Sequence, residues 1–532
     1  MSTAIAPALN RETSRGLYAD EQLASALAYF RGGRYDKAET IYKKILKKDA
    51  ENIGALHMLG LLAQKNGRPE RAIQLLIKAA KFDPRRPEIL CDLGNTFKTL
   101  VRHKDAIKAH RMVLTMLPNS PEAHSNLGSA YKAAGKAGKA VICLESALKM
   151  RPKDVELKYN LGNGLVASER YEEAEETLRQ VVYEKPDHIR AQINLCVALK
   201  EQGRYDAAIR RHQKAIAAVP DSADAHWNHG LTLLAMGNFA DGWDEYEWRT
   251  LLPSFAMQAM DRPQWTGEIL DGRTLLVHAE QGLGDTLQFV RYLSFLHETD
   301  GDVVFACPDR LIPLIQGFAA DIRVVPLDKK VPHDIQTPLM SLPRLFHEAL
   351  PFKPKGGSYL GPDANRITHW ADQLGAGPAH RIGISWQGST GYENDGRRSI
   401  PLLNFEPLAR MDGVELVSLQ QGEGSEQIAE MPWRDRITDL TADMDEDGAF
   451  TDTLAVMASL DLVVTSDTAI AHLAGAAGIP VFLALCHLPD WRWGLKGQSS
   501  PWYSSMRLFR QENAGDWTDV FDRISTAAAE GS

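Results

Sequence analysis

The chain has 532 residues, of which 44 % are hydrophobic and 24 % charged, so it is long enough for several domains, each with its own core. Its formal charge of −9 is uneven: residues 1–250 hold 38 Lys+Arg against 31 Asp+Glu, a net +7, and the remainder holds 22 against 38, a net −16. Neither part has the clustered basic charge that nucleic-acid binding needs, so no nucleic acid is expected as a partner.

The cysteines and the apolar stretches indicate a cytoplasmic protein. The five cysteines are far apart and show no CxxC or Cys/His ligand spacing, so we expect reduced, buried thiols and no metal site. Residues 1–18 lack the basic region and apolar core of a secretion signal and are expected to be disordered. The apolar stretches have the length of strands, and no membrane insertion is expected.

A 34-residue period dominates residues 19–250. Three residue types mark it, and each sits where two helices cross closely or where a turn begins. The glycines are Gly60, Gly94, Gly128, Gly162 and Gly230, with Cys196 in the missing place. The alanines are Ala38, Ala72, Ala106, Ala140, Ala174 and Ala208, and the prolines are Pro84, Pro118, Pro152, Pro186 and Pro220. This pattern resembles the tetratricopeptide repeat, with six full repeats and a partial seventh, and implies an α-solenoid.

The residue two places before each glycine of the period is expected to face the concave groove of the solenoid. Beyond the first repeat these residues are Asp92, Asn126, Asn160, Asn194 and Asn228. A carboxamide both donates and accepts hydrogen bonds, so a row of them suits an extended peptide backbone. The row resembles the asparagine ladder of O-GlcNAc transferases, which implies a protein acceptor in the groove. Asparagine is also common at this place in tetratricopeptide repeats generally, and that alternative stays open.

The seventh repeat departs from the pattern. Gly242 replaces the alanine, and the aromatic residues Trp243, Tyr246 and Trp248 follow at helical spacing. We expect them to dock the end of the array onto the next domain, with residues 251–271 as a linker.

After Gly272 short apolar runs alternate with helical segments. The expected strands are Thr274–His278, Val303–Cys307, Arg323–Pro326, His333–Gln336, Arg381–Trp386, Val414–Leu419, Ile437–Leu440, Leu462–Thr465 and Pro480–Leu485. The alternation predicts two doubly wound parallel sheets, in residues 272–375 and 376–510, and a C-terminal helix in residues 511–532.

The stretch Leu460–Leu485 reads as strand, turn, helix and strand, with Asp467 and Thr468 at the start of the helix. The free N–H groups and positive dipole end of such a helix favour anions, for example a diphosphate. An ordinary βαβ unit with a good N-cap would look the same.

Two Rossmann-like halves, a GLGD loop after the first strand and the segment TSDTAIAHLAGAAG resemble a GT-B glycosyltransferase, closest to the heptosyltransferase-like superfamily. With the repeats, the chain resembles bacterial repeat-containing glycosyltransferases, a group that includes flagellin glycosyltransferases. The resemblance implies that Asp285, in the loop with Gly282 and Gly284, is the general base; the alternative is that Asp285 only caps its helix. The loop lacks the third glycine of the dinucleotide fingerprint, so NAD binding is not favoured.

The same resemblance places the nucleotide-sugar in the C-terminal half. It implies that Asp467 contacts the sugar of the donor. The main-chain N–H groups of Thr468, Ala469 and Ile470 would then bind the diphosphate. The remaining donor-side candidates are Ser389, Thr390, Arg398, Gln420 and His472, the last being alternatively a buried structural histidine. Residues 490–493, Asp-Trp-Arg-Trp, are expected either to stack on the base of the nucleotide or to close the cleft between the two sheets. Both alternatives stay open. Asp443-Met444-Asp445 mimics a DxD metal motif but lies in an acidic loop, where a solvated charge run is expected.

Together these features predict an inverting, metal-independent glycosyltransferase that needs no cofactor and transfers a sugar from a nucleotide-sugar to Ser or Thr hydroxyls of a protein in the groove. One alternative is a heptosyltransferase-like enzyme that acts on a lipopolysaccharide or other glycan. The other is a non-catalytic peptide-binding scaffold.

Overall fold

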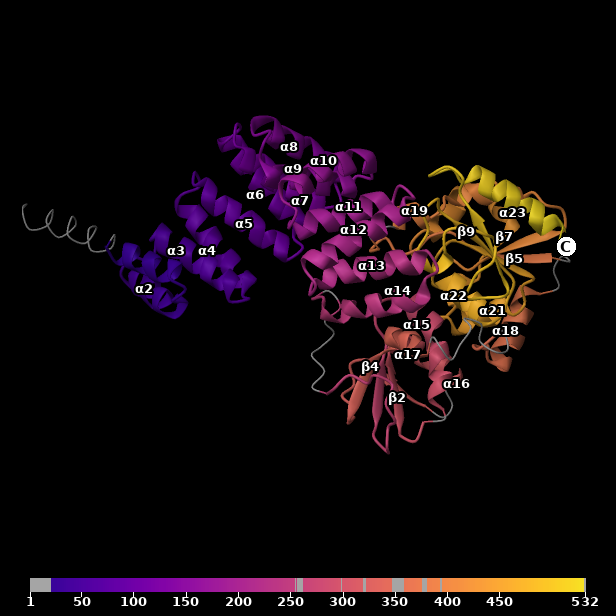
Figure 1. Cartoon of the computed structure of the whole chain (residues 1–532). Helices are drawn as coiled ribbons and strands as arrows, with labels where there is room; N and C mark the ends of the chain where they lie inside the picture. Colours follow the sequence, from indigo (N-terminus) through magenta and orange to yellow (C-terminus); the bar gives the residue numbers. More distant parts are fainter. Residues whose placement is uncertain are drawn as a thin grey trace, which may run out of the picture. The chain divides into compact units, whose positions relative to one another are not determined.

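The computed structural model describes residues 21–253, 255, 262–297, 299–318, 322–346, 358–375, 380–392 and 395–530 (Figure 1). The predicted disordered segment 1–18 lies outside the described residues. The chain divides into two compact units, residues 1–204 and 205–532. No helix in the described ranges is long and apolar enough to cross a bilayer.

The first unit is a stack of antiparallel helix pairs. A helix over residues 21–31 pairs with the first of a regular series. The series is α2 (Tyr35–Lys48), α3 (Ile53–Lys65), α4 (Pro69–Phe82), α5 (Pro87–Thr99), α6 (His103–Met116), α7 (Pro121–Ala133), α8 (Ala137–Met150), α9 (Val155–Ala167), α10 (Tyr171–Glu184) and α11 (Ile189–Lys200). The periodic glycines are where paired helices touch: a Cβ at Gly128 would lie 2.8 Å from Leu144 Cγ. The predicted helical solenoid is therefore present.

The last repeats belong to the second unit. They comprise α12 (Tyr205–Ala218), α13 (Ala223–Ala235), α14 (Phe239–Tyr246) and the 3₁₀ turn η1 (Glu247–Leu251). A Cβ at Gly230 would lie 2.6 Å from the backbone nitrogen of Tyr246, so α13 and α14 cross as closely as in a complete repeat. The seventh repeat pairs α13 with α14, which has 8 residues where the second helix of the sixth repeat, α12, has 14.

The first sheet has four parallel strands in the order β3-β2-β1-β4. They are β1 (Leu275–His278), β2 (Val303–Cys307), β3 (Arg323–Pro326) and β4 (Ile335–Pro338). Between and after them lie α15 (Leu283–Phe289), η2 (Val290–Leu296), η3 (Asp309–Leu311), α16 (Ile312–Phe318), η4 (Leu339–Ser341) and α17 (Leu342–Phe346). The described part of the predicted linker packs on this sheet, because Trp265 is buried and its backbone N–H donates to Gln336 O at 2.7 Å.

The second sheet has six parallel strands in the order β10-β9-β8-β5-β6-β7. They are β5 (His380–Ser385), β6 (Val414–Ser418), β7 (Ile437–Thr438), β8 (Leu462–Thr465), β9 (Val481–Leu485) and β10 (Met506–Arg510). Strand β10 was not expected from the sequence. The order runs outward in both directions from β5 and β8, which is the arrangement of a doubly wound dinucleotide-binding sheet.

Helices cover both faces of the second sheet. Helices α20 (Glu406–Ala409) and α23 (Thr518–Glu530) pack on the face of Ile382 and Ile384. Helices α21 (Thr451–Met457) and α22 (Ala469–Ala476) pack on the face of Val463 and join the core of the first sheet. The remaining segments are α18 (Ala364–Leu374), α19 (Asp395–Arg398), η5 (Leu402–Phe405), η6 (Ser425–Glu430), η7 (Arg434–Arg436), η8 (Thr441–Asp443) and η9 (Trp491–Trp493).

Candidate functional site

The point where the strand order reverses in the second sheet lies between β5 and β8, and ligands of doubly wound sheets bind at this point, beyond the carboxyl ends of the strands. The loop after β5 ends in α19 with Arg398, and the turn after β8 contains Asp467 and Thr468. The two connect directly, because Arg398 Nη1 donates to Asp467 O at 2.9 Å. A Cβ at Gly388 would lie 2.6 Å from Arg398 Nη2, so the loop backbone passes tightly over this guanidinium. The structure thus brings Arg398 next to the turn that contains Thr468, and donor binding by these residues stays a prediction.

The start of α22 carries two buried hydroxyls that the protein does not satisfy. Thr468 is the N-cap residue, but its side chain makes no capping bond. Ser466 Oγ and Thr468 Oγ1 are both buried and have no hydrogen-bond partner in the described part of the chain. An unsatisfied buried hydroxyl costs about 1–3 kcal/mol. An anion at the positive end of α22 would satisfy both hydroxyls and the first N–H groups of the helix, those of Ala469 and Ile470.

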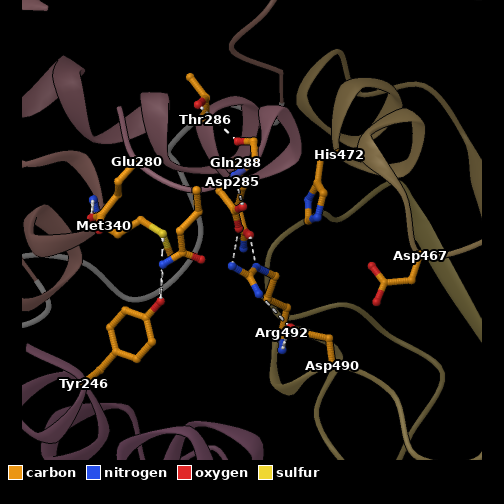
Figure 2. Close-up of polar contacts among 12 residues, drawn as sticks. Tyr246, Glu280, Asp285, Thr286, Gln288, Met340, Asp467, His472, Asp490 and Arg492 are labelled. Carbon is orange, nitrogen blue, oxygen red and sulfur yellow. Dashed lines mark hydrogen bonds and ion pairs between the residues drawn. The ribbon is translucent and has the colours of Figure 1, made fainter. Parts of the chain in front are cut away.

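Asp467 and His472 lie close to this helix start (Figure 2). Burial and the nearby Asp490 carboxylate raise the pKa of Asp467 to about 6. His472 is buried, its Nδ1 is 3.0 Å from Tyr503 Oη, and its ring stacks on Trp493. Burial, with Arg492 nearby, lowers the pKa of His472 well below its ordinary value, so this imidazole is neutral at pH 7. The neutral, packed His472 matches the structural alternative, and its role as a ligand residue stays a prediction.

Asp285 reaches the same region from the first sheet. Its Oδ2 accepts from the N–H of Gly282, the N-cap residue of α15, at 2.8 Å. Its Oδ1 accepts a hydrogen bond from Arg492 Nη2, across to the C-terminal half (Figure 2). Burial raises the pKa of Asp285, although Arg492 opposes the shift. The carboxylate therefore does cap its helix, and it also bonds to Arg492 of the C-terminal half; its role as a general base stays a prediction.

The two helices that carry Asp285 and Thr468 touch at their first turns. A Cβ at Gly284 would lie 3.1 Å from His472 Cδ2 and 3.5 Å from Ala469 Cα. A larger residue at this position would push α15 away from α22. Gly284 therefore allows the close approach that brings Asp285 next to the start of α22.

Arg492, for which the sequence left open stacking on the base or closing the cleft, connects the two halves. Besides Asp285, its guanidinium donates to Asp490 Oδ1 at 2.8 Å and to Gln288 Oε1 at 2.8 Å. It also lies 4.4 Å from the ring centre of Trp491. The aromatic and basic run around Arg492 indicated a contact surface, but its partner Asp285, 207 residues earlier, is visible only in the fold.

The other donor-side candidates shape the loop after β5. Thr390 donates from its N–H and its Oγ1 to the carboxylate of Glu423, both at 2.8 Å, while Ser389 Oγ accepts from the N–H of Gly391. The amide of Gln420 is buried and occupied: its Oε1 accepts from the N–H groups of Trp386 and Gln387, and its Nε2 donates to Glu423 O at 2.8 Å. Gln420 therefore braces the loop, and contact with a nucleotide would require these bonds to break.

The DxD-like segment is structural. Asp445 Oδ1 accepts from the N–H groups of Asp452 and Thr453 at 2.7 and 3.1 Å, and Gln421 Nε2 donates to its Oδ2 at 2.7 Å. These contacts cap α21 and hold the Asp445 carboxylate in a hydrogen-bond network, whereas Asp443 is exposed, as the predicted solvated charge run implies. In the described ranges, no group of His, Cys, Asp or Glu residues is arranged to hold a metal ion.

The predicted ladder residues bond to the neighbouring repeat. Asp92 Oδ2 lies 2.6 Å from His57 Nε2, and Asn160 Nδ2 donates to Ser125 Oγ at 3.1 Å. Asn126 Nδ2 lies 4.0 Å from Cys91 Sγ, and each of these pairs spans 35 residues. Asn194 is half-buried, and Asn228, in the second unit, donates to Asp224 O within its own helix. Asp92, Asn126 and Asn160 therefore link adjacent repeats, and peptide binding by the row stays a prediction.

Comparison with known proteins identifies the repeats. A family described as tetratricopeptide repeat matches residues 17–90 and 133–196, and one described as TPR repeat matches residues 197–237. The front part of the chain therefore consists of tetratricopeptide repeats, as predicted.

The curated relative found is protein FlbA of Caulobacter vibrioides, which is 31 % identical over 330 residues. The match covers 56 % of this chain and 53 % of FlbA, so the chain spans about half the length of this relative. Among solved structures, a tetratricopeptide repeat protein of Parabacteroides merdae is 16 % identical with a TM-score of 0.41, covering 44 % of this chain and 93 % of that chain. YrrB, a TPR protein with an unusual peptide-binding site, is 21 % identical with a TM-score of 0.29, covering 35 % of this chain and 95 % of its own.

Proposed function

We propose that this chain is a GT-B-type glycosyltransferase that transfers a sugar from a nucleotide-sugar to Ser or Thr hydroxyls of a protein acceptor. The observation that carries the proposal is the start of α22 at the reversal point of the second sheet. There a helix N-terminus, the guanidinium of Arg398 and the unsatisfied hydroxyls of Ser466 and Thr468 lie together. This set suits the phosphate of an activated sugar.

Asp285 is the proposed general base. Its carboxyl group has a raised pKa and lies beside the donor-side residues, which favours proton transfer near neutral pH. In the proposed step Asp285 takes the proton of the acceptor hydroxyl, the new C–O bond forms at the anomeric carbon, and the nucleotide leaves with the electron pair. The start of α22 and Arg398 would stabilise the charge on the leaving phosphate. Direct displacement of this kind inverts the anomeric configuration.

The ion pair between Arg492 and Asp285 would couple donor binding to the basicity of Asp285. In the structure it neutralises Asp285 and Asp490. If its guanidinium turns toward the incoming phosphate, Asp285 loses a positive neighbour and becomes more basic. Donor binding would then prepare the base for the acceptor.

The repeats support a protein as the acceptor, because tetratricopeptide arrays present a groove that suits extended segments. Flagellin is the candidate that the family resemblance suggests. The test is the intact mass of flagellin and other surface proteins from a strain that lacks this chain, compared with the same strain carrying the wild-type or the Asp285→Asn form. We expect the loss of a fixed sugar mass that only the wild-type form restores. Unchanged masses for all surface proteins would favour a binding scaffold instead.

A further inference from the structure

The last repeat ends inside the domain that follows it. Trp243 of α14 is 1 % exposed, and its ring lies edge-on to Phe289 of α15, with the centroids 5.9 Å apart, and to Trp491. The predicted docking role of Trp243 and Tyr246 is therefore visible within one compact unit. Trp248 differs, because its ring stacks on His226 of the same repeat at 3.9 Å.

Arg249, three residues beyond α14, is completely buried. Its Nη2 and Nε donate to the two carboxylate oxygens of Glu280, at 2.6 and 3.1 Å. The same guanidinium donates to Ser341 Oγ at 3.0 Å and to Glu247 Oε2 at 3.0 Å. A bidentate arginine–carboxylate pair fixes geometry as well as charge.

The two partners of Arg249 mark a special position in the first sheet. Glu280 follows β1 and Ser341 follows β4, and the strand order reverses between these neighbouring strands. This is the place where doubly wound sheets bind ligands. Here the side chain of Arg249, from the last repeat, lies at this position. The N–H of Met340 also donates to Glu280 Oε1, at 3.2 Å.

The loop from Glu280 to Asp285 contains one residue in an uncommon backbone conformation. Gln281 has φ +63°, in the left-handed region, which is uncommon for a residue with a Cβ. Such strain persists only where surrounding contacts fix the backbone. The contact here is with the last repeat, since Gln281 Nε2 donates to Tyr246 Oη at 2.8 Å. Four residues after Gln281 comes Asp285, whose carboxylate bonds back to Gly282.

We propose that Tyr246 and Arg249 of the last repeat are positioning residues for Asp285. Arg249 fixes Glu280, Tyr246 fixes Gln281, and the strained turn between them directs the start of α15, and with it Asp285, toward α22. The catalytic half therefore includes the end of the repeat array. This inference rests on the proposed function only for the role of Asp285; the control of the loop by the repeat is independent of it.

The test compares Tyr246→Phe and Arg249→Met in the full chain. Tyr246→Phe removes one hydroxyl and keeps the packed ring, so it tests the loop even if Arg249→Met, which leaves the buried Glu280 without its cationic partner, folds poorly. The matched control is Asp244→Asn, which removes an exposed ion pair with Arg344 across the same contact, 2.7 Å in the wild type, without touching the loop. Two properties are measured: hydrogen exchange of the amides of residues 280–289, and kcat with the nucleotide affinity determined separately.

For Tyr246→Phe we expect exchange of residues 280–289 to accelerate about 3- to 10-fold, from the loss of one hydrogen bond. We expect kcat to fall by a similar or larger factor, because small displacements of a reacting group are costly, while nucleotide affinity and the exchange of α22 stay unchanged. Asp244→Asn should match the wild type in both measurements. Unchanged exchange in both loop variants would overturn the inference. Faster exchange in a protein that shows no transferase activity even as wild type would support the control of the loop and refute the proposed function instead.

Discussion

The replacement Asp467→Asn should make the protein more stable, and more so at high pH. Burial and the Asp490 carboxylate raise the pKa of Asp467 from 3.8 to about 6, so the folded protein holds this proton about 100-fold more tightly than the unfolded chain, an effect of about 3 kcal/mol at most. Between about pH 4 and pH 6 the unfolded carboxyl releases its proton first, so the wild type loses stability as the pH rises. Above about pH 6 the loss of folding stability caused by the charged Asp467 carboxylate is complete. An asparagine side chain does not titrate, so the variant does not lose this stability.

The assay is urea unfolding followed by tryptophan fluorescence. All 11 tryptophans lie between residues 227 and 517, so the fluorescence reports on the second unit. We expect the advantage of Asp467→Asn at pH 8 to shrink by about half at pH 5. The exposed Asp443→Asn serves as the control and should show no such trend. A variant that is less stable than the wild type at pH 8, or equally stabilised at both pH values, would refute the reasoning that the site holds a disfavoured carboxylate.

Three further outcomes are expected. Asp285→Asn should lower transfer about 10²- to 10⁴-fold and leave nucleotide affinity within about 3-fold, as determined by product mass and calorimetry; loss of nucleotide binding instead would place Asp285 on the donor. A chain of residues 205–532 should fold and bind nucleotide, whereas residues 251–532 should aggregate, because the second form lacks Trp243, Tyr246 and Arg249; size-exclusion chromatography separates these outcomes. EDTA should leave turnover unchanged, because Arg398, Arg492 and the start of α22 supply the positive charge, and recovery of a lost activity by added Mg²⁺ or Mn²⁺ would contradict that mechanism.

Much of the fold follows from local patterns in the sequence. The 34-residue spacing of small residues predicted the solenoid, since each periodic glycine or alanine lies at a close helix crossing. Buried apolar runs predicted nine of the parallel strands, with Val303–Cys307 and Leu462–Thr465 matched to the residue. Strand β10 was missed because two arginines interrupt the apolar residues of Met506–Arg510 at a sheet edge, so it lacks the continuous apolar run of the central strands.

The candidate site was only partly predictable, for a physical reason. Arg398, Asp467 and Thr468 come from loops after neighbouring strands, so a correct strand order is enough to bring them together. Arg492 and Asp285 meet through packing between the two halves, and Arg249 reaches Glu280 through docking of the last repeat. Such contacts depend on how whole elements pack, and no local spacing reveals them. Gln420 was predicted from its place after a strand, but the loops after β5 and β6 already occupy its amide group.

The most direct test of the central claim is calorimetric titration of the full chain with UDP, GDP, CMP and ADP and their sugar conjugates. The account predicts that one nucleotide series binds, that Arg398→Ala weakens this binding at least 10-fold, and that Thr468→Val weakens it by the loss of one hydrogen bond, about 3- to 10-fold. Asp443→Asn should bind as the wild type does. Absence of binding by every member of the panel, or binding that neither Arg398→Ala nor Thr468→Val changes, would contradict a phosphate site at the start of α22.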